Sequence, residues 1–309
     1  MIKYFIFFIP ELLSVYELLK KEHVDIVHCN GTWQIKGILG GWLCGAGVIW
    51  HLNDTRVVGF INTMFKLLAL RLCHGFITAG ERVRIHYCND RRFSKKLVME
   101  IQAPVDTSSF DPDRVESDQT LENFDGLRIV TVGNVNPAKG FEYFIEMASI
   151  LNKQYGNLTF VVVGPHFESQ KKYSEKLRSL VKRLRMDNLV FYGRSSDVAS
   201  VLKAADIYVC SSVSEASPMS VWEAMSMARP IVSSNVGDVA KFIKDRENGF
   251  VVPVKNPAAL AEKAGMLIEN RDLRRIFGEK ARDVAIQYLD VEICVRKHAE
   301  FYRQVMKMS

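Results

Sequence analysis

Two glutamates, Glu215 and Glu223, stand eight residues apart after a short apolar run at 205–210. Ser217 is of a type that caps helices, and Pro218 fits a first helical turn, where no N–H is needed. The pattern predicts a strand, a loop that holds Glu215, and a helix that holds Glu223. The N–H groups at such a helix start suit a phosphate, and the carboxylates suit sugar or ribose hydroxyls. A capped helix with two unrelated glutamates fits the spacing at least as well.

A second candidate loop carries a lysine. It runs from Gly133 to Gly140 as Gly-Asn-Val-Asn-Pro-Ala-Lys-Gly, between a strand-like run and a helical one. Glycine lets the backbone turn tightly beside a ligand, and Lys139 can place a point charge on a phosphate. The loop matches neither the Walker A motif nor the G-x-G-x-x-G dinucleotide fingerprint. Taken alone, such a lysine is more often a solvated loop residue.

The elements that would position these residues form two α/β halves. In the first half, strands are expected near 24–29, 48–51 and 75–79, with an apolar helix at 60–72. Short apolar strands that alternate with helices indicate parallel sheets covered on both faces. Ligands of such sheets bind at the carboxyl ends of the strands.

The second half restarts at 127 with a strand and continues with a helix at 141–152. The expected domains are an N-terminal Rossmann-like domain over 1–108, a linker over 109–126, a second Rossmann-like domain over 127–288, and a helix over 289–309 that packs back toward the N-terminal domain.

Composition is that of an ordinary globular protein. The 309 residues are 48% hydrophobic and 25% charged, enough for roughly two domains. The net charge of +6 is modest, and the basic residues lack the aromatic interleaving of a single-strand binder, so no nucleic-acid partner is expected. The six cysteines form no C-x-x-C pair, which predicts reduced, mostly buried thiols in a cytosolic protein.

The N-terminal residues 1–20 are apolar but interrupted. Pro10 and Glu11 end the run well short of the ~20 residues that a membrane span needs. We interpret this stretch as a helical or partly extended packing segment, with contact to a membrane surface as the alternative.

Several short motifs occur in a fixed order along the second half. They are Gly133…Lys139-Gly140, Val163-Gly164-Pro165, Glu215-x7-Glu223-Ala224-Met225, Pro230-Ile231-Val232, Val236-Gly237-Asp238 and Asn248-Gly249-Phe250-Val251-Val252-Pro253. Together they resemble the retaining glycosyltransferases of family 4, and the resemblance covers roughly residues 20–305. It implies the α/β GT-B fold, with two Rossmann-like domains whose parallel sheets face each other across a cleft. It also implies transfer of a sugar, with retained configuration, from a UDP- or GDP-sugar to a hydroxyl of a glycan or lipid-linked acceptor. Cell-surface polysaccharide or lipopolysaccharide synthesis is the expected process.

The resemblance gives each matching residue a role. Glu215 would contact the donor sugar, Glu223 the ribose hydroxyls and Lys139 the diphosphate. Further donor-binding residues are expected in the flanking loops: Gly133, Asn134, Arg194, Ser195, Ala216, Ser217, Met219 and Ser220. The resemblance implies no metal and no other cofactor.

Three residues of the first half complete the expected site. His51, after an apolar strand, is similar to the family histidine that faces the donor sugar and is grouped with Glu215 and Lys139 as catalytic. A structural hydrogen-bonding role for this histidine is about equally expected. Asn30 and Gly31 would line the acceptor side, although a turn explains Asn-Gly equally well. The expected location is cytoplasmic, with peripheral contact at the inner face of the cell membrane.

The chain departs from the family pattern at several positions. Asn134 stands where the family usually has arginine, Gly237-Asp238 replaces two glycines, and Lys241 stands where a glutamate is usual. By the same resemblance, the first strand and the Gly-rich acceptor-side loop are lacking, so the N-terminal domain is expected to be incomplete. These departures motivate an alternative function: a truncated, non-catalytic or weakly active relative that acts as a binding partner in glycan assembly.

Overall fold

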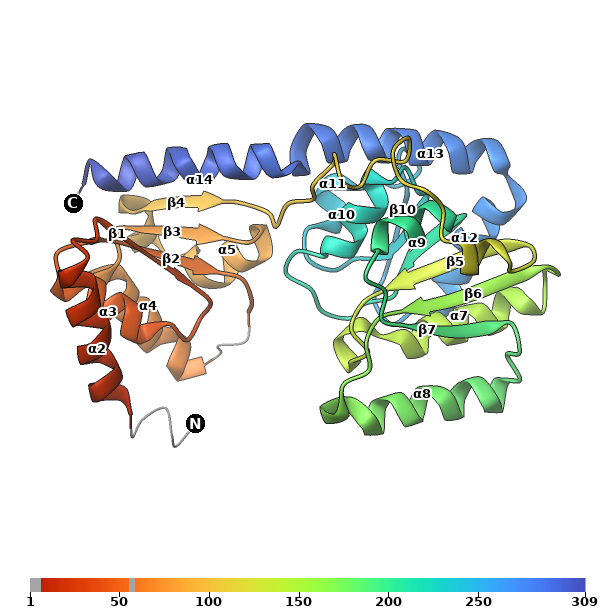
Figure 1. Cartoon of the computed structure of the whole chain (residues 1–309), viewed down its shortest axis with the longest axis horizontal. Coiled ribbons are helices and arrows are strands. Elements are labelled where there is room, and N and C mark those ends of the chain that lie inside the picture. The colour runs from red at the N-terminus through yellow and green to blue at the C-terminus, as the bar shows by residue number, and fades with distance from the viewer. Residues whose placement is uncertain (1–6, 56–58, 309) are drawn as a thin grey trace. The chain divides into compact units, whose positions relative to one another are not determined.

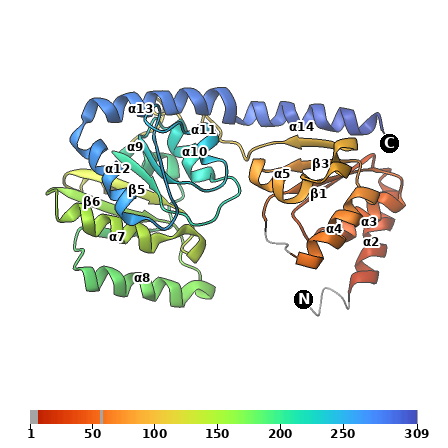
Figure 2. The same cartoon turned by 180° about the vertical axis from the view of Figure 1, so that it is seen from behind.

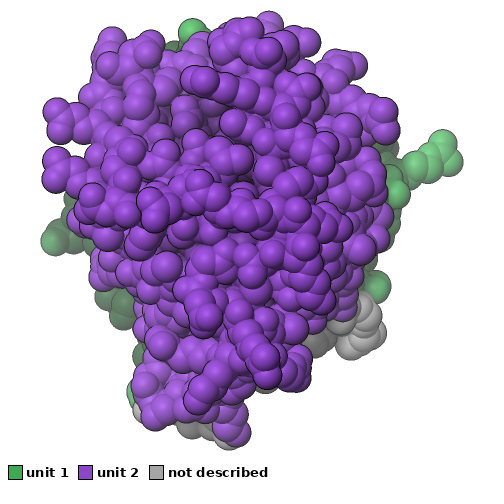
Figure 3. Space-filling view, turned by 90° about the vertical axis from the view of Figure 1, so that its right-hand side faces the viewer, with its two compact units in different colours: residues 1–103, 292–309 green, residues 104–291 purple. Residues whose placement is uncertain are grey.

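A computed structural model of the chain describes residues 7–55 and 59–308. The chain divides into two compact units, which Figure 3 colours separately. Unit 1 comprises Met1–Ala103 and Glu292–Ser309, and unit 2 comprises Pro104–Val291. The segment 109–126 lies within unit 2 and holds the short helix α6 (Gln119–Glu122), whose Leu121 is buried.

Unit 1 is built on a four-stranded parallel sheet of order β1-β2-β3-β4. The strands are β1 (Ile26–Asn30), β2 (Gly47–Leu52), β3 (Gly75–Thr78) and β4 (Leu97–Glu100). Its helices are α2 (Phe8–Lys21), α3 (Ile35–Leu43), α4 (Gly59–Leu72), α5 (Glu81–Cys88), the 3-10 helix η1 (Arg91–Lys95) and α14 (Val291–Met306). The predicted strands at 24–29, 48–51 and 75–79 and the predicted helix at 60–72 are confirmed to within two residues.

The two faces of this sheet are covered by different parts of the chain. Helix α3 packs on one face, where a Cβ on Gly41 would lie only 2.9 Å from Val27 Cγ2. Helix α14 covers the opposite face, where Phe301 and Val305 join a buried cluster with Ile49 and other strand residues. Figures 1 and 2 show α3 and α14 on opposite sides of the sheet. The sheet is therefore completed by the last residues of the chain.

Helix α2 forms an outer layer over α3 and buries none of its side chains fully. A Cβ on Gly40 of α3 would lie 2.9 Å from Val15 Cγ1, so this glycine lets the two helices approach closely. The expected packing segment over 1–20 is helical from Phe8 onward, and its residues 1–6 lie outside the described residues.

Unit 2 holds a six-stranded parallel sheet of order β10-β9-β8-β5-β6-β7. The strands are β5 (Leu127–Val132), β6 (Leu158–Val163), β7 (Leu189–Gly193), β8 (Ile207–Cys210), β9 (Ile231–Ser234) and β10 (Phe250–Val252). The helices are η2 (Pro137–Lys139), α7 (Phe141–Asn152), η3 (Glu168–Gln170), α8 (Lys171–Leu184), α9 (Val198–Ala204), α10 (Met219–Ser226), α11 (Val239–Phe242), α12 (Pro257–Glu269), α13 (Arg271–Val284) and η4 (Ala285–Leu289). The helix predicted over 141–152 is confirmed by α7.

Both faces of this sheet are buried, as the sequence pattern predicts for a parallel sheet. Helices α7, α8 and α12 pack on one face, and α9, α10 and α13 on the other. The strand order progresses from β5 toward β7 on one side and from β8 toward β10 on the other. The order reverses between β5 and β8, and we call the carboxyl ends of these two strands the crevice, because open α/β sheets bind ligands at such a point.

Two further sequence predictions concern the cysteines and the membrane. All six cysteines are free thiols, and Cys29, Cys73, Cys88 and Cys210 are buried. Within residues 7–55 and 59–308, no helix combines the length and the apolar character that crossing a bilayer requires.

Candidate active site

Lys139 and Glu215 meet at the crevice between β5 and β8. Lys139 ends η2, which follows β5, and its Nζ lies 2.7 Å from Glu215 Oε1 in the loop after β8. The Ser212 hydroxyl donates to the same carboxylate oxygen over 2.9 Å. Both charged side chains are largely shielded from solvent. Two adjacent strands thus place a cation and a hydrogen-bond acceptor together, although 76 residues separate them along the chain.

Glycines allow the loops around this pair to pack closely. The stem of Lys139 crosses Gly133, where a Cβ would lie 2.8 Å from the lysine Cε. Gly164, after β6, presses on the same loop, and a Cβ there would lie 1.9 Å from the Gly133 carbonyl oxygen. Gly140 has a φ of +59°, and the neighbouring Ser211 hydroxyl donates to the Lys139 carbonyl oxygen over 3.1 Å. The backbone around Lys139 is therefore fixed by packing that a larger residue would disrupt.

Helix α10 begins directly after the Glu215 loop, but not with the predicted cap. Pro218 occupies the N-cap position, and no side chain caps the helix. The prediction that Ser217 caps it is wrong, because the Ser217 hydroxyl instead accepts a hydrogen bond from the indole N–H of Trp222 over 3.1 Å. Trp222 is fully buried, and a buried indole N–H needs an acceptor.

The start of α10 is instead supported by its neighbours. The Ser220 hydroxyl accepts from the buried Tyr208 hydroxyl over 2.8 Å. Gly237, after β9, has a φ of +50°, and a Cβ there would lie 2.5 Å from the Ala216 carbonyl oxygen. Met219, the first helical residue, is half exposed. The first N–H groups of α10 thus stand beside the Glu215 loop, where the helix dipole favours an anion.

Glu223 lies in α10 and is mostly buried. Burial raises the pKa of Glu223, and the positive charge of Lys139 opposes that increase. Lys139 therefore acts electrostatically on both predicted glutamates. A buried carboxylate is stabilised by hydrogen-bond donors, and ligand hydroxyls would supply them here.

The other predicted donor-binding residues lie at the same sheet edge but apart from the ion pair. Asn134 is exposed, and its carbonyl oxygen accepts from the Asn136 side chain over 3.2 Å. Arg194 is exposed after β7, and the Ser195 hydroxyl accepts from the Asp197 N–H over 3.0 Å. Strand β6 separates β7 from β5, so the Arg194 loop flanks the crevice rather than joining the Lys139–Glu215 contact.

In unit 1, the predicted Asn30 and Gly31 follow β1 and are tied to the end of β2. The Gly31 N–H donates to the His51 carbonyl oxygen over 2.9 Å, and the Trp50 indole donates to the Gly31 carbonyl oxygen over 3.0 Å. Asn53 donates from its side-chain amide to Asn30 Oδ1 over 2.5 Å. Among the described residues, Asn53 Oδ1 is buried without a hydrogen-bond partner. These contacts place polar groups at the carboxyl edge of the unit 1 sheet.

The His51 side chain points to the face of the sheet that α14 covers. Its Nδ1 lies 3.2 Å from His28 Nε2, and its ring centroid lies 5.8 Å from that of His298. Burial, together with the adjacent rings of His28 and His298, lowers the pKa of His51 to about 4. His51 is therefore neutral at pH 7. Its contact with a donor sugar stays a prediction.

Several residues that shape these sites carried no usable sequence signal. Ser212 is one of many serines, and nothing local marks it as a partner of Glu215. His28 interrupts an apolar strand, which was a weak signal, but its partner Tyr302 lies 274 residues away. Asn53 lies two residues after His51, and only the structure, which leaves its Oδ1 buried without a hydrogen-bond partner, sets it apart from other asparagines.

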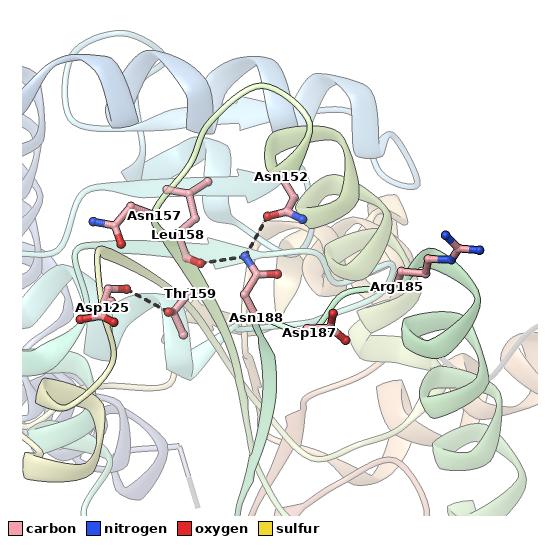
Figure 4. A pocket seen from close by; sticks show the side chains of 8 residues that line it. All are labelled: Asp125, Asn152, Asn157, Leu158, Thr159, Arg185, Asp187 and Asn188. Carbon is pink, nitrogen blue, oxygen red and sulfur yellow. Dashed lines mark hydrogen bonds between the residues drawn. The ribbon is translucent and has the colours of Figure 1, made fainter.

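A pocket elsewhere on unit 2 lies away from this crevice (Figure 4). Asn188 Nδ2 donates to Asn152 Oδ1 over 2.9 Å and to the Leu158 carbonyl oxygen over 2.8 Å. The lining residues are Asp125, Asn152, Asn157, Leu158, Thr159, Arg185, Asp187 and Asn188. Leu158 and Leu189 begin β6 and β7, so this pocket is at the amino ends of the strands, opposite the Lys139–Glu215 edge.

Comparison with known proteins identifies similar chains. The model of the family "Glycosyl transferases group 1" matches residues 113–284. A Campylobacter jejuni relative, N,N'-diacetylbacillosaminyl-diphospho-undecaprenol alpha-1,3-N-acetylgalactosaminyltransferase, is 26% identical over 80% of this chain and 64% of its own length. The chain spans about two-thirds or less of the length of several curated relatives that it matches.

Solved structures share the fold. A glycosyltransferase from Rickettsia africae ESF-5 superposes with a TM-score of 0.86 at 20% identity, covering 97% of this chain and 82% of that one. Anabaena Alr3699/HepE in complex with UDP-glucose gives a TM-score of 0.84 at 18% identity, covering 96% and 82%. With the two parallel sheets, these similarities confirm the predicted GT-B fold class.

Proposed function

Since the chain belongs to the family of glycosyl transferases group 1, we propose that it transfers a sugar from a UDP- or GDP-sugar to a hydroxyl of a glycan or lipid-linked acceptor. The observation that carries this proposal is the Lys139–Glu215 pair at the β5–β8 crevice, beside the start of α10. The UDP-glucose complex of the Anabaena protein and the lipid-linked acceptor named for the Campylobacter jejuni relative support the two substrate classes.

Each polar group at the crevice suits one part of such a donor. Lys139 and the positive end of the α10 dipole would stabilise the diphosphate, whose charge increases as it departs. Glu223 would accept hydrogen bonds from the ribose hydroxyls, and Glu215 from a hydroxyl of the sugar. Substrate binding would then replace the Lys139–Glu215 contact with a contact from Lys139 to the diphosphate and one from Glu215 to the sugar.

The proposed reaction retains the configuration of the sugar. The acceptor oxygen forms a bond to the anomeric carbon on the face from which the diphosphate departs, as the bond from that carbon to the diphosphate oxygen breaks. The proton of the acceptor hydroxyl passes to the departing diphosphate. In this scheme the chain contributes positioning and electrostatic stabilisation, and it needs no carboxylate nucleophile.

The acceptor class suggests where the protein works. We place it in the cytoplasm, with peripheral contact at the inner face of the membrane and a role in cell-surface glycan synthesis. Helix α2 supports this placement, because Ile9, Leu13 and Leu18 are each more than half exposed and Lys20 and Lys21 lie in its last turn. Exposed apolar side chains next to basic ones are typical of a surface that binds anionic lipid.

The first test removes the two central charges. Lys139→Ala should lower kcat/KM for sugar transfer about 10- to 150-fold, because it deletes a charge-assisted contact to the diphosphate. Glu215→Ala should also reduce transfer. The matched controls are Lys182→Ala and Glu175→Ala on the exposed face of α8, which should leave the rate unchanged. Unaltered transfer in both site variants would contradict the assignment.

A second measurement separates catalysis from binding alone. Calorimetry with a panel of UDP- and GDP-sugars gives donor affinity, and radiolabelled transfer to undecaprenol-linked and glycan acceptors gives turnover. Tight donor binding without transfer to any acceptor would favour the non-catalytic alternative, for which the exposed Asn134 in place of a second cation is the motivating observation.

A further inference from the structure

A chain of hydrogen bonds links helix α14 to His51 through β1. The Tyr302 hydroxyl lies 2.6 Å from His28 Nδ1, and His28 Nε2 lies 3.2 Å from His51 Nδ1. All three residues belong to unit 1, and His28 is therefore bonded through both ring nitrogens. A neutral imidazole has one donor and one acceptor nitrogen. The role of one His28 nitrogen therefore fixes the role of the other, and so that of the His51 nitrogen bonded to it.

One direction of this chain starts with the phenol as the donor. Burial raises the pKa of Tyr302, so its hydroxyl keeps its proton at neutral pH. A phenol that donates to His28 Nδ1 over a short distance leaves the His28 proton on Nε2. That N–H then donates to His51 Nδ1, which leaves the proton of His51 on Nε2.

His298 supports this arrangement from the same helix. Its Nδ1 lies 2.9 Å from the Cys294 carbonyl oxygen, which can only accept, so this nitrogen carries a proton. Its ring stacks on His28 with centroids 5.9 Å apart and planes 21° apart. Burial, with the charge of His298, lowers the pKa of His28, so the bonded rings stay neutral.

We propose that Tyr302 and His28 are positioning residues that hold His51 as the tautomer protonated on Nε2. His51 is the penultimate residue of β2, at the edge of the sheet where ligands bind. It then presents a hydrogen-bond donor rather than a base at this edge of the unit 1 sheet, and the group that fits it is a hydroxyl or phosphoryl oxygen of a ligand. The contact with this ligand rests on the proposed function, whereas the tautomer does not.

The tautomer can be measured without substrate. Two-bond ¹H–¹⁵N correlation spectra of protein labelled with ¹⁵N-histidine distinguish a protonated Nδ1 from a protonated Nε2. Wild-type His51 should carry its proton on Nε2 at neutral pH. Tyr302→Phe removes the donor to His28, so His28 and His51 should populate both tautomers. Tyr288→Phe, at a half-exposed tyrosine of η4, is the matched control and should leave the His51 signals unchanged.

Variants of His28 test the direction of the chain. His28→Gln retains an acceptor oxygen and a donor nitrogen and should preserve the His51 tautomer, whereas His28→Leu should lose it. Tyr302→Phe and His28→Leu should lower kcat/KM about 3- to 10-fold, the effect of one impaired hydrogen bond, and His28→Gln should recover most of it.

The outcomes are separable. A proton on His51 Nδ1 in the wild type, or an unchanged tautomer in Tyr302→Phe, would overturn the proposal. A shifted tautomer with unchanged transfer would overturn its link to the reaction. Absence of transfer in the wild type would count against the proposed function, while the spectra would still decide the tautomer.

Discussion

At the scale of single residues, the crevice of unit 2 holds its two glutamates in different electrostatic environments. Lys139 and Glu215 neutralise each other directly, whereas Glu223 is partly buried and its pKa is raised. The sequence predicted that these three residues share a site, because motif order specifies residue type and approximate position; their roles in donor binding stay a prediction. It did not identify Ser212 as a partner of Glu215, since that contact depends on loop geometry.

His51 should make the stability of unit 1 depend on pH. Its pKa is about 4 in the folded chain and near 6.5 when exposed, so between these values the unfolded chain binds a proton that the folded chain does not. The free energy of unfolding should therefore fall as the pH drops from 6.5 to 4, by up to about 3 kcal/mol. Unfolding midpoints measured from pH 7.5 to 4.5 should fall more steeply for the wild type than for His51→Gln. Parallel slopes would rule out this role of His51.

At the scale of elements, local sequence patterns predicted the helices and strands, whereas contacts that form only in the folded chain were not predicted. Alternating apolar runs predicted the strands and the helix α7, because burial of each element follows from its own sequence period. The cap of α10 was mispredicted, because Trp222 competes for Ser217 through a contact that exists only in the folded chain. The Tyr302–His28 hydrogen bond joins elements at opposite ends of the chain, so no local sequence pattern predicted it.

Close packing between the loops after β5 and β6 predicts a sharp sensitivity at Gly164. Gly164→Ala would place a methyl group against the Gly133 carbonyl oxygen at a φ of +150°, so the Lys139 loop would have to move. We expect a loss of about 1–3 kcal/mol in the free energy of unfolding, together with weaker donor binding. Chemical denaturation and UDP titration would measure the two effects.

Gly156→Ala is the matched control for this substitution. Nothing lies within 4 Å of a Cβ at Gly156, so its unfolding midpoint should stay close to that of the wild type. Equal behaviour of the two alanine variants would show that the loop contact tolerates a side chain.

At the scale of the whole molecule, unit 1 is discontinuous in sequence. Its sheet comes from the first hundred residues, and the helix that covers one face comes from the last eighteen. The key contact is Phe301 on Gly75, where a Cβ would lie 2.6 Å from the phenyl Cζ. Stability of unit 1 thus depends on residues that lie beyond all of unit 2 in the sequence.

Phe301→Ala should destabilise unit 1 selectively. Truncation of this fully buried ring should cost about 3–5 kcal/mol, because it removes apolar contact and leaves a cavity over the sheet. Limited proteolysis should show faster cleavage within residues 7–103 and little change within 104–291. Val295→Ala, at a position 54% exposed on the same helix, should behave as the wild type. Equal acceleration of cleavage in both units would refute selective destabilisation.

Because unit 1 is built from two distant parts of the chain, its sheet is synthesised well before the helix that covers it. A nascent chain exposes the β3 glycine that receives Phe301 long before Phe301 is made, and at ribosomal rates of about 5–20 residues per second the delay is roughly 10–45 s. Throughout that interval, in which unit 2 is translated, the apolar face of Ile49 and Ile77 has no covering helix. The first third of the chain to leave the ribosome is therefore the last part to complete its native core, so the apolar face of the N-terminal sheet stays uncovered longest during synthesis.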